Sequence, residues 1–298
     1  MSEVEALLQS ATAQNTQETY SRGLKCFEEF HYNFGGKKSS WPPTLEHIIE
    51  FIGYMSVKGF TDSTAKTYIA GISYYLKLQN HFDFTQNFIV KKLLEGYKRK
   101  AKTKDNRMPI TGEILTNLVE KLPVVCSNLY ETSLFAAAYT TAFFGFFRVG
   151  EITSVKKGKQ GHEIQFDCIK VSQNKQTVEI RLDHSKTDQM AKGTTVTIRN
   201  TNVGINIRPV DILLSYLAKR PKFTGNLFCH YNGEPLTRSQ FTGILKKALR
   251  LLGVDVTKYK SHSFRIGAAT LAAAIGMSEE EICKAGRWKS HSYKSYIR

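Results

Sequence analysis

Apolar residues recur at every third or fourth position along the first hundred residues, which is the spacing of helices that bury one face. The clearest stripe lies in a helix that begins near Thr16 and stops at Gly35-Gly36. Its apolar positions are Tyr20, Leu24, Phe27, Phe30 and Phe34. The opposite face of this helix carries Arg22 and Lys25, so the pattern predicts an amphipathic helix with a basic outer side.

Three more helices are predicted in the same part of the chain. Thr44 is placed to cap the second helix, and Asp62 or Ser63 opens the third. The fourth helix runs from about Phe88 to Tyr97. Residues 1–97 are therefore expected to form an all-α domain.

The pattern becomes mixed after residue 110. A helix begins at Thr111, and a long apolar helix is expected from Ser133 to about Val155, with Arg148 and Glu151 near its carboxyl end. Apolar and polar residues then alternate over 163–171, 177–182 and 194–198, which predicts a small antiparallel sheet. Lys186 falls between the second and third of these segments and is expected on a hairpin turn.

Helical spacing returns for the rest of the chain. Pro209 begins one helix, and residues 237–240 form a capping box for another that Gly253 ends. His262 and Arg265 are three residues apart on a helix that Gly276 ends, so both should lie on one face. A second capping box at 278–281 opens a short helix to Gly286. Residues 111–298 are therefore expected to form a mixed α+β domain, mainly helical.

A strongly basic segment separates the two predicted domains. Residues 98–110 are expected to be a linker, and the segment from Lys91 to Arg107 holds eight basic residues against Glu95 and Asp105. The segment could lie along phosphates, act as a nuclear import signal, or be a solvated hinge. The whole chain of 298 residues has a formal charge of +16. This excess of positive charge favours nucleic acid as the partner.

Several other classes of protein are disfavoured. The amino terminus has no basic-then-apolar export signal, and the apolar run from Leu134 to Phe147 is too short to span a bilayer. The five cysteines are scattered, without the spacing of metal ligands, so they are expected to be reduced thiols. We therefore expect a soluble intracellular protein with no metal site and no membrane partner.

Several residues have the chemistry for work on a phosphate. Two arginines, Arg148 and Arg265, can clamp one phosphate and stabilise its transition state. A histidine and an indole N–H can complete the cradle, a tyrosine hydroxyl can attack phosphorus, and a lysine can protonate a leaving alkoxide. No metal or other cofactor is needed for such a site. Taken singly, each of these residues also has an ordinary structural interpretation.

The order of these residues resembles the catalytic signature of the tyrosine recombinases, also called the phage integrase family. The signature consists of Arg148-x-x-Glu151, Lys186, His262-x-x-Arg265, Trp288 and Tyr296. The resemblance implies a helical core-binding domain and a catalytic domain that together clamp DNA. It also implies two duplex recombination sites, a protein dimer on each site and a tetramer when the sites pair.

The resemblance also implies a role for each residue. Tyr296 would attack a DNA phosphodiester to give a 3′-phosphotyrosyl link and a free 5′-hydroxyl. Arg148 and Arg265 would hold the non-bridging oxygens, and Lys186 would be the general acid. His262 would bond the phosphate and assist the tyrosine proton, Trp288 would fill the family's His/Trp position, and Glu151 would orient Arg148 or His262.

Three strings look most like recombinases of eukaryotic mobile elements, the crypton and DIRS-like branches. They are 108–111 (Met-Pro-Ile-Thr), 185–189 (Ser-Lys-Thr-Asp-Gln) and 286–290 (Gly-Arg-Trp-Lys-Ser). This likeness implies a role in integration or excision of an element, and location in the nucleus if the host is eukaryotic. If the host is not eukaryotic, the protein is expected in the cytoplasm.

The chain departs from the family pattern in two ways. The spacing from Trp288 to Tyr296 is one residue shorter than in many members, which makes Tyr293 a competitor for the nucleophile. The sequence also stops two residues after Tyr296, where members usually continue into a segment that docks on a neighbouring protomer, and this puts tetramer assembly in doubt.

Two other functions stay open: a type IB topoisomerase, which rejoins the same strand, and a domesticated DNA-binding protein without catalysis. In each case DNA contacts are expected from basic or hydroxyl-bearing residues at helix starts, on helix faces and in the linker. These candidates are Arg22, Lys25, Thr64, Lys66, Lys98, Arg99, Lys100, Lys102, Lys104, Arg107, Arg238, Ser239, Gln240 and Lys246.

Overall fold

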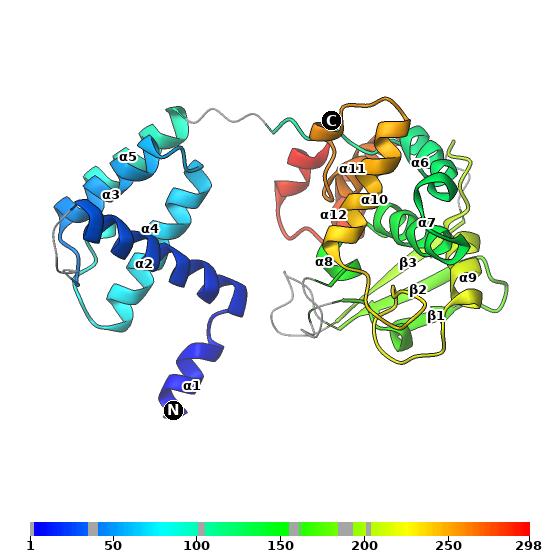
Figure 1. The fold of residues 1–298 in the computed structure, drawn as a ribbon, viewed down its shortest axis with the longest axis horizontal. Helices are drawn as coiled ribbons and strands as arrows, with labels where there is room; N and C mark the ends of the chain where they lie inside the picture. The colour runs from blue at the N-terminus through cyan, green and yellow to red at the C-terminus, as the bar shows by residue number, and fades with distance from the viewer. Residues whose placement is uncertain are drawn as a thin grey trace. The chain divides into compact units, whose positions relative to one another are not determined.

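The chain divides into two compact units, Met1–Asp105 and Asn106–Arg298 (Figure 1). The computed structural model describes residues 3–34, 41–100, 105–154, 161, 163–183, 193–200 and 204–298. The division falls within the basic stretch 98–110. Each unit has its own hydrophobic core.

The described elements of the first unit are helical. They are α1 (Glu3–Ser10), α2 (Gln14–Phe34), α3 (Leu45–Val57), α4 (Asp62–Leu78), η1 (Phe84–Gln86) and α5 (Phe88–Lys100). Thr44 caps α3 as expected, and Thr61, one residue before the expected start, caps α4. The fully buried residues Ile48, Phe51 and Ile72 lie in the core between these helices.

The basic stretch begins as helix. Helix α5 continues through Lys100 and carries Lys98, Arg99 and Lys100 in its last turn. Positive side chains are favourable there because the carboxyl end of a helix is the negative end of its dipole. The helix expected to end near Tyr97 therefore continues three residues further, to Lys100, while Lys102 and Lys104 lie outside the described residues.

The second unit contains most of the helices in the described chain. They are α6 (Gly112–Val125), α7 (Leu129–Phe144), α8 (Val149–Ile152), α9 (Pro209–Lys219), α10 (Arg238–Leu251), α11 (Ser263–Ala274) and α12 (Glu279–Gly286), with the short η2 (Phe166–Cys168), η3 (Val256–Lys258) and η4 (His291–Tyr296). Both expected capping boxes are present, at Thr237 with Gln240 and at Ser278 with Glu281. Local caps of this kind set where α10 and α12 begin.

The expected single helix from Ser133 to about Val155 is wrong. Helix α7 ends at Phe144, and a new short helix, α8, begins after Arg148. Phe146 between them has a left-handed backbone with φ of 49°. A left-handed residue interrupts the α-helical hydrogen-bond pattern, so the chain turns here. Arg148 is consequently the N-cap of α8, not a residue near the end of a long helix.

The sheet has three antiparallel strands in the order β1-β2-β3: β1 (Ile169–Val171), β2 (Thr177–Leu182) and β3 (Thr194–Arg199). Ile169 pairs with Ile180, and Leu182 pairs with Thr194. The first strand is shorter than the expected 163–171 because 166–168 form η2. Strand β2 alternates between buried and less buried residues, so one face of the sheet joins the core.

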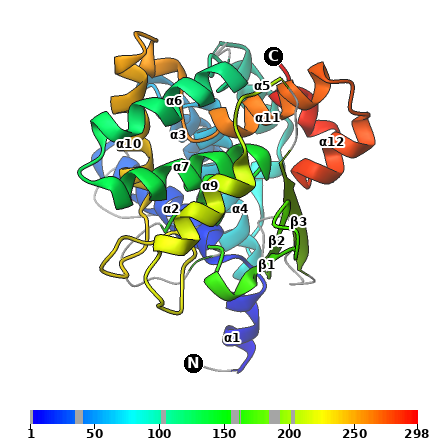
Figure 2. The same ribbon diagram turned by 90° about the vertical axis from the view of Figure 1, so that its right-hand side faces the viewer.

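Helix α7 lies at the centre of the second unit's core, and Leu134, Ala137 and Tyr139 on it are fully buried. It packs against α6, α9 and α11, and α11 in turn packs against α12 and η4 (Figure 2). Among the described residues no helix is long and apolar enough to cross a membrane. All five cysteines are free thiols.

Helix α11 is held close to the segment that enters the second unit. The Ile110 N–H donates to the Ser263 carbonyl over 2.9 Å. A Cβ added to Gly267 would lie 1.8 Å from the Ile110 oxygen, so only glycine permits this approach.

We therefore expect Gly267→Ala to lower the free energy of unfolding by about 1–3 kcal/mol, because backbone must move to admit the methyl group. Gly243→Ala in α10 is the matched control: a Cβ there meets nothing within 4 Å. This control substitution should leave the free energy of unfolding at the wild-type value or raise it by up to about 1 kcal/mol. Urea unfolding measures both, and equal midpoints for the two variants would contradict the close approach.

Candidate active site

Six of the seven predicted active-site residues are described, and all six lie in the second unit. Arg148 caps α8, Glu151 lies within α8, and His262 caps α11, with Arg265 in its first turn. Trp288 follows α12, and Tyr296 ends η4. Lys186 lies outside the described residues, in the stretch between β2 and β3.

Arg265 is buried, with 1% of its surface exposed. Its guanidinium donates to the carbonyls of Phe146 and Gly286, while its Nε has no partner. Its Cζ lies 4.2 Å from the ring centre of Trp288 and 5.7 Å from that of Tyr296. The two rings therefore pack against the cation, and carbonyl oxygens fix its plane.

The tyrosine, tryptophan and histidine of the signature form one aromatic group. The rings of Trp288 and Tyr296 are 5.1 Å apart, and those of His262 and Tyr296 are 6.4 Å apart. Tyr296 is only partly buried. The alternative nucleophile, Tyr293, is 1% exposed and packs in a small core with Ala268 and Ile282. Burial raises the pKa of Tyr293 to about 12, which opposes formation of a tyrosinate.

Glu151 joins two arginines. Its Oε1 accepts from Arg148 Nη1 over 3.1 Å, and its Oε2 accepts from Arg287 Nη2 over 2.8 Å. The same Oε2 accepts from the Arg148 backbone N–H over 2.8 Å. Of the two roles expected for this carboxylate, the contact with Arg148 is observed. The side chains of Glu151 and Arg287 are 4% and 6% exposed, so their ion pair is buried.

The surroundings of His262 are strongly positive. Burial lowers its pKa, and the charges of Arg107, Arg238, Arg265 and Arg148 lower it further. A ring in this setting is neutral at pH 7 and can accept a proton. Burial also lowers the pKa of Arg265, and the charges of Arg148 and Arg287 act in the same direction. An anion bound among these groups would be stabilised by all of them.

Sequence reasoning missed Arg287 and the backbone of Phe146. Arg287 has φ of 55°, donates to the carbonyls of Gly145 and Phe146 over 3.2 Å each, and lies over the Phe147 ring. A left-handed backbone in a residue other than glycine costs about 1–2 kcal/mol, so the surrounding contacts must hold it. The position of Arg287, directly before Trp288, was the available signal; nothing in the sequence marks Phe146.

The other predicted DNA-contact residues are distributed over both units. Arg22, Lys25, Arg238 and Ser239 are exposed, and Lys66 is the fifth residue of α4. Thr64 Oγ1 lies 2.8 Å from the Thr61 hydroxyl. The Gln240 side-chain oxygen accepts from the Thr237 backbone in the capping box. Thr64 and Gln240 thus have structural contacts at helix starts, and Lys246 lies farther along α10.

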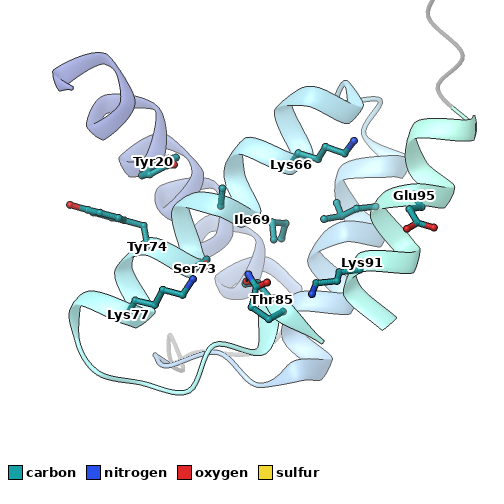
Figure 3. A pocket seen from close by; sticks show the side chains of 12 residues that line it. Tyr20, Lys66, Ile69, Ser73, Tyr74, Lys77, Thr85, Lys91 and Glu95 are labelled. Carbon is teal, nitrogen blue, oxygen red and sulfur yellow. The ribbon is translucent and has the colours of Figure 1, made fainter. Parts of the chain in front are cut away.

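The first unit has a groove of about 640 Å³ between α2, α4, η1 and α5 (Figure 3). Lys66, Lys77 and Lys91 line it, together with the rings of Tyr20 and Tyr74. Lys77 is paired with Asp83 over 3.2 Å, and Lys66 lies 4.0 Å from Asp62. The groove is therefore basic, with part of its charge already balanced.

The described residues contain no group of three or more His, Cys, Asp or Glu side chains arranged to hold a metal ion. The polar groups that converge in the second unit are instead three guanidinium groups, one carboxylate, one imidazole and one phenol. This set is suited to holding a phosphate and moving a proton beside it.

Three solved structures share the architecture of the chain. The XerH site-specific recombinase bound to its difH substrate matches with a TM-score of 0.67 at 16% identity, over 94% of this chain and 75% of that one. The Tn1549 transposon integrase in complex with circular intermediate DNA matches with 0.62 at 13% identity, over 96% and 90%. A lambda integrase dimer bound to a COC′ core site matches with 0.65 at 16% identity, over 99% and 92%.

The chain therefore has the tyrosine-recombinase fold, a mostly helical structure with a small three-stranded antiparallel sheet. These three similar proteins are a recombinase and two integrases, each solved with DNA. No protein-family model and no curated protein matches the sequence.

The lowered pKa of His262 gives a direct test of the site's electrostatics. A histidine whose folded-state pKa lies below the unfolded value of about 6.5 destabilises the fold as the pH falls through that value. We expect the His262 ring to titrate below pH 6.5 in NMR spectra, with His262→Asn used to assign its signal. His230, whose pKa is raised by the Glu131 carboxylate 2.8 Å away, should titrate above 6.5 and is the control. A higher midpoint for His262 than for His230 would contradict this description.

Proposed function

We propose that this protein is a site-specific DNA recombinase that cuts and rejoins strands through a 3′-phosphotyrosyl intermediate on Tyr296. The observation that carries the proposal is the convergence of Arg148, His262, Arg265, Trp288 and Tyr296 in one unit, around a buried arginine. These residues come from segments separated by up to 148 positions, from Arg148 to Tyr296.

The first step is an in-line attack. The Tyr296 oxygen forms a bond to phosphorus as the bond from phosphorus to the 5′ oxygen breaks. The neutral His262 takes the phenol proton, and Lys186 gives a proton to the leaving 5′ oxygen. Arg148 and Arg265 hold the two non-bridging oxygens, whose negative charge increases in the transition state.

The second step reverses the first with a different strand. A 5′-hydroxyl from the partner duplex attacks phosphorus and gives its proton to Lys186, which the first step left neutral. The bond from phosphorus to the Tyr296 oxygen breaks, and that oxygen takes the proton held by His262. The phosphodiester energy is kept in the tyrosyl link, so the exchange needs no ATP. Trp288 packs on Arg265 and Tyr296, and so holds in place both the phosphate-binding guanidinium and the attacking phenol.

Duplex DNA is the proposed substrate, with the basic first unit and the second unit closing on it as a clamp. The similar XerH and Tn1549 proteins were solved with DNA, and lambda integrase was solved as a dimer on a core site and as a tetramer on a Holliday junction. By analogy we propose a dimer on each site and a tetramer when two sites pair. The net charge of +16 supports a polyanionic partner.

The strings at 108–111, 185–189 and 286–290 support the narrower proposal that the protein moves a eukaryotic mobile element of the crypton or DIRS-like kind. The nucleus would then be its place of action. The basic residues of 91–107 are the proposed import signal.

Removing the hydroxyl of Tyr296 tests the proposed nucleophile. The wild-type protein is incubated with duplexes of randomised sequence that carry a nick. Cleavage beside the nick releases a short strand end, so the strand cannot be rejoined and the protein stays covalently attached. Detergent-stable adducts are then captured and their DNA is sequenced. On the enriched duplex, Tyr296→Phe should give no adduct because the oxygen that attacks phosphorus has been removed. Tyr293→Phe should give the wild-type yield, because that hydroxyl is buried elsewhere.

An adduct formed by Tyr296→Phe would refute the assignment of the nucleophile. The enriched duplex also separates a recombinase from a topoisomerase. Two labelled copies should exchange strands, whereas relaxation of a supercoiled plasmid carrying the site, without exchange, would contradict the recombinase proposal.

The role of Lys186 has its own test. We expect Lys186→Met to slow cleavage of the ordinary duplex by about 10²- to 10⁴-fold, because the 5′ alkoxide then leaves unprotonated. A duplex with sulfur in place of the bridging 5′ oxygen should be cut at nearly the wild-type rate, since a thiolate needs no proton to leave. The same defect on both substrates would show that Lys186 is not the general acid.

A further inference from the structure

A third arginine lies at the site, and neither the predicted signature nor the proposed steps use it. The Arg287 side chain is 6% exposed and pairs with Glu151 over 2.8 Å. A cation is expensive to bury, so an arginine held at this depth needs the carboxylate and carbonyl oxygens around it. Its position suggests a purpose beyond packing.

The backbone conformation at residues 286 and 287 determines where this arginine points. Arg287 is the left-handed C-cap of α12, and Gly286 before it cannot hold a Cβ, which would lie 1.7 Å from the Trp288 ring. The turn therefore directs Arg287 toward α8 while it directs Trp288 onto Arg265. Residues 286–288 thus place one side chain against Glu151 and another against Arg265.

The two oxygens of Glu151 are divided between the arginines. The Arg148 side chain donates one bond, from Nη1 to Oε1, whereas Oε2 accepts from the Arg287 side chain and from the Arg148 backbone N–H. If Oε2 lost Arg287, a carboxylate beside a lone guanidinium would favour two parallel bonds to Arg148. Such a fork would turn the Arg148 donors away from a phosphate and toward Glu151.

Arg287 also connects Arg148 to Arg265. The Phe146 carbonyl accepts from both Arg265 and Arg287, and Arg287 in turn holds the partner of Arg148. This gives one chain of contacts: Arg148, Glu151, Arg287, the Phe146 carbonyl and Arg265. The two phosphate-binding arginines are thereby fixed relative to each other.

We propose that Arg287 is a positioning residue, which acts through Glu151 and the Phe146 carbonyl to present Arg148 and Arg265 to the scissile phosphate. It touches neither the DNA nor the reacting atoms. The inference rests on the proposed function, and it deepens it by adding a residue outside the predicted signature.

The test uses Arg287→Gly and Arg287→Lys in the full chain. Glycine suits the left-handed backbone at φ of 55°, so a defect of Arg287→Gly comes from the lost side chain and not from a strained turn. Lysine keeps the charge but not the planar fork. Single-turnover adduct formation and Kd are measured on the duplex enriched by the wild-type protein.

Arg287→Gly should form the adduct about 10²-fold more slowly, with Kd changed by no more than about threefold, because orientation in the transition state is lost while DNA contacts remain. Arg287→Lys should fall between Arg287→Gly and wild type. Added methylguanidinium should restore part of the rate of Arg287→Gly and should not change that of wild type.

A double-mutant cycle shows whether the effect passes through Glu151. In a Glu151→Gln background, Arg287→Gly should slow the reaction by a smaller factor than in wild type, because the carboxylate that it restrains is gone. Equal factors in the two backgrounds would refute action through Glu151. A wild-type rate for Arg287→Gly would refute the proposal altogether.

A variant that does not fold and a wild-type protein that forms no adduct have different consequences. If Arg287→Gly does not fold, Arg287→Lys carries the test, and a folded Lys variant with the wild-type rate constant refutes the need for the fork. If wild-type protein gives no adduct with any duplex, the proposed function fails, whatever the variants do.

Discussion

Glu151 is the one carboxylate that forms ion pairs with the arginines clustered in the second unit, among the residues described. It accepts from Arg148 and Arg287, and Arg287 shares a backbone carbonyl with Arg265. Three guanidinium groups and one carboxylate leave a formal charge of +2. Charges of one sign at close range in a poorly solvated site destabilise the free protein. The hydrophobic core around α7 and α11 must offset that repulsion, and a bound phosphate would relieve it.

That charge also suits the proposed chemistry. A phosphodiester carries one negative charge, and its five-coordinate transition state carries about two, so a site with an excess of two positive charges favours the transition state over the ground state. The neutral His262 fits the same scheme, since a cation there could not take the phenol proton. The aromatic rings that pack on Arg265 exclude water, so the attraction between its charge and the phosphate is less screened.

The sequence was most informative where a structural signal is local. Thr44, Thr111 and the capping boxes at Thr237 and Ser278 mark helix starts because each cap bonds a neighbour within three residues. The break at Phe146 was missed because apolar residues continue through it, and periodicity does not report a left-handed residue. Arg287 was missed because its partner, Glu151, is distant in sequence. The signature's order selected residues that the structure brings together where it describes them, but it did not predict the contacts that orient them.

Mass spectrometry of the trapped adduct tests the central claim most directly. Trypsin cuts after Lys294 and so separates the two candidate tyrosines, leaving Tyr296 in the peptide 295–298 and Tyr293 in the peptide 290–294. After nuclease digestion, the account predicts a nucleotide on Tyr296 in the peptide Ser-Tyr-Ile-Arg, joined through a 3′-phosphate. A nucleotide on Tyr293, or one joined through a 5′-phosphate, would contradict it.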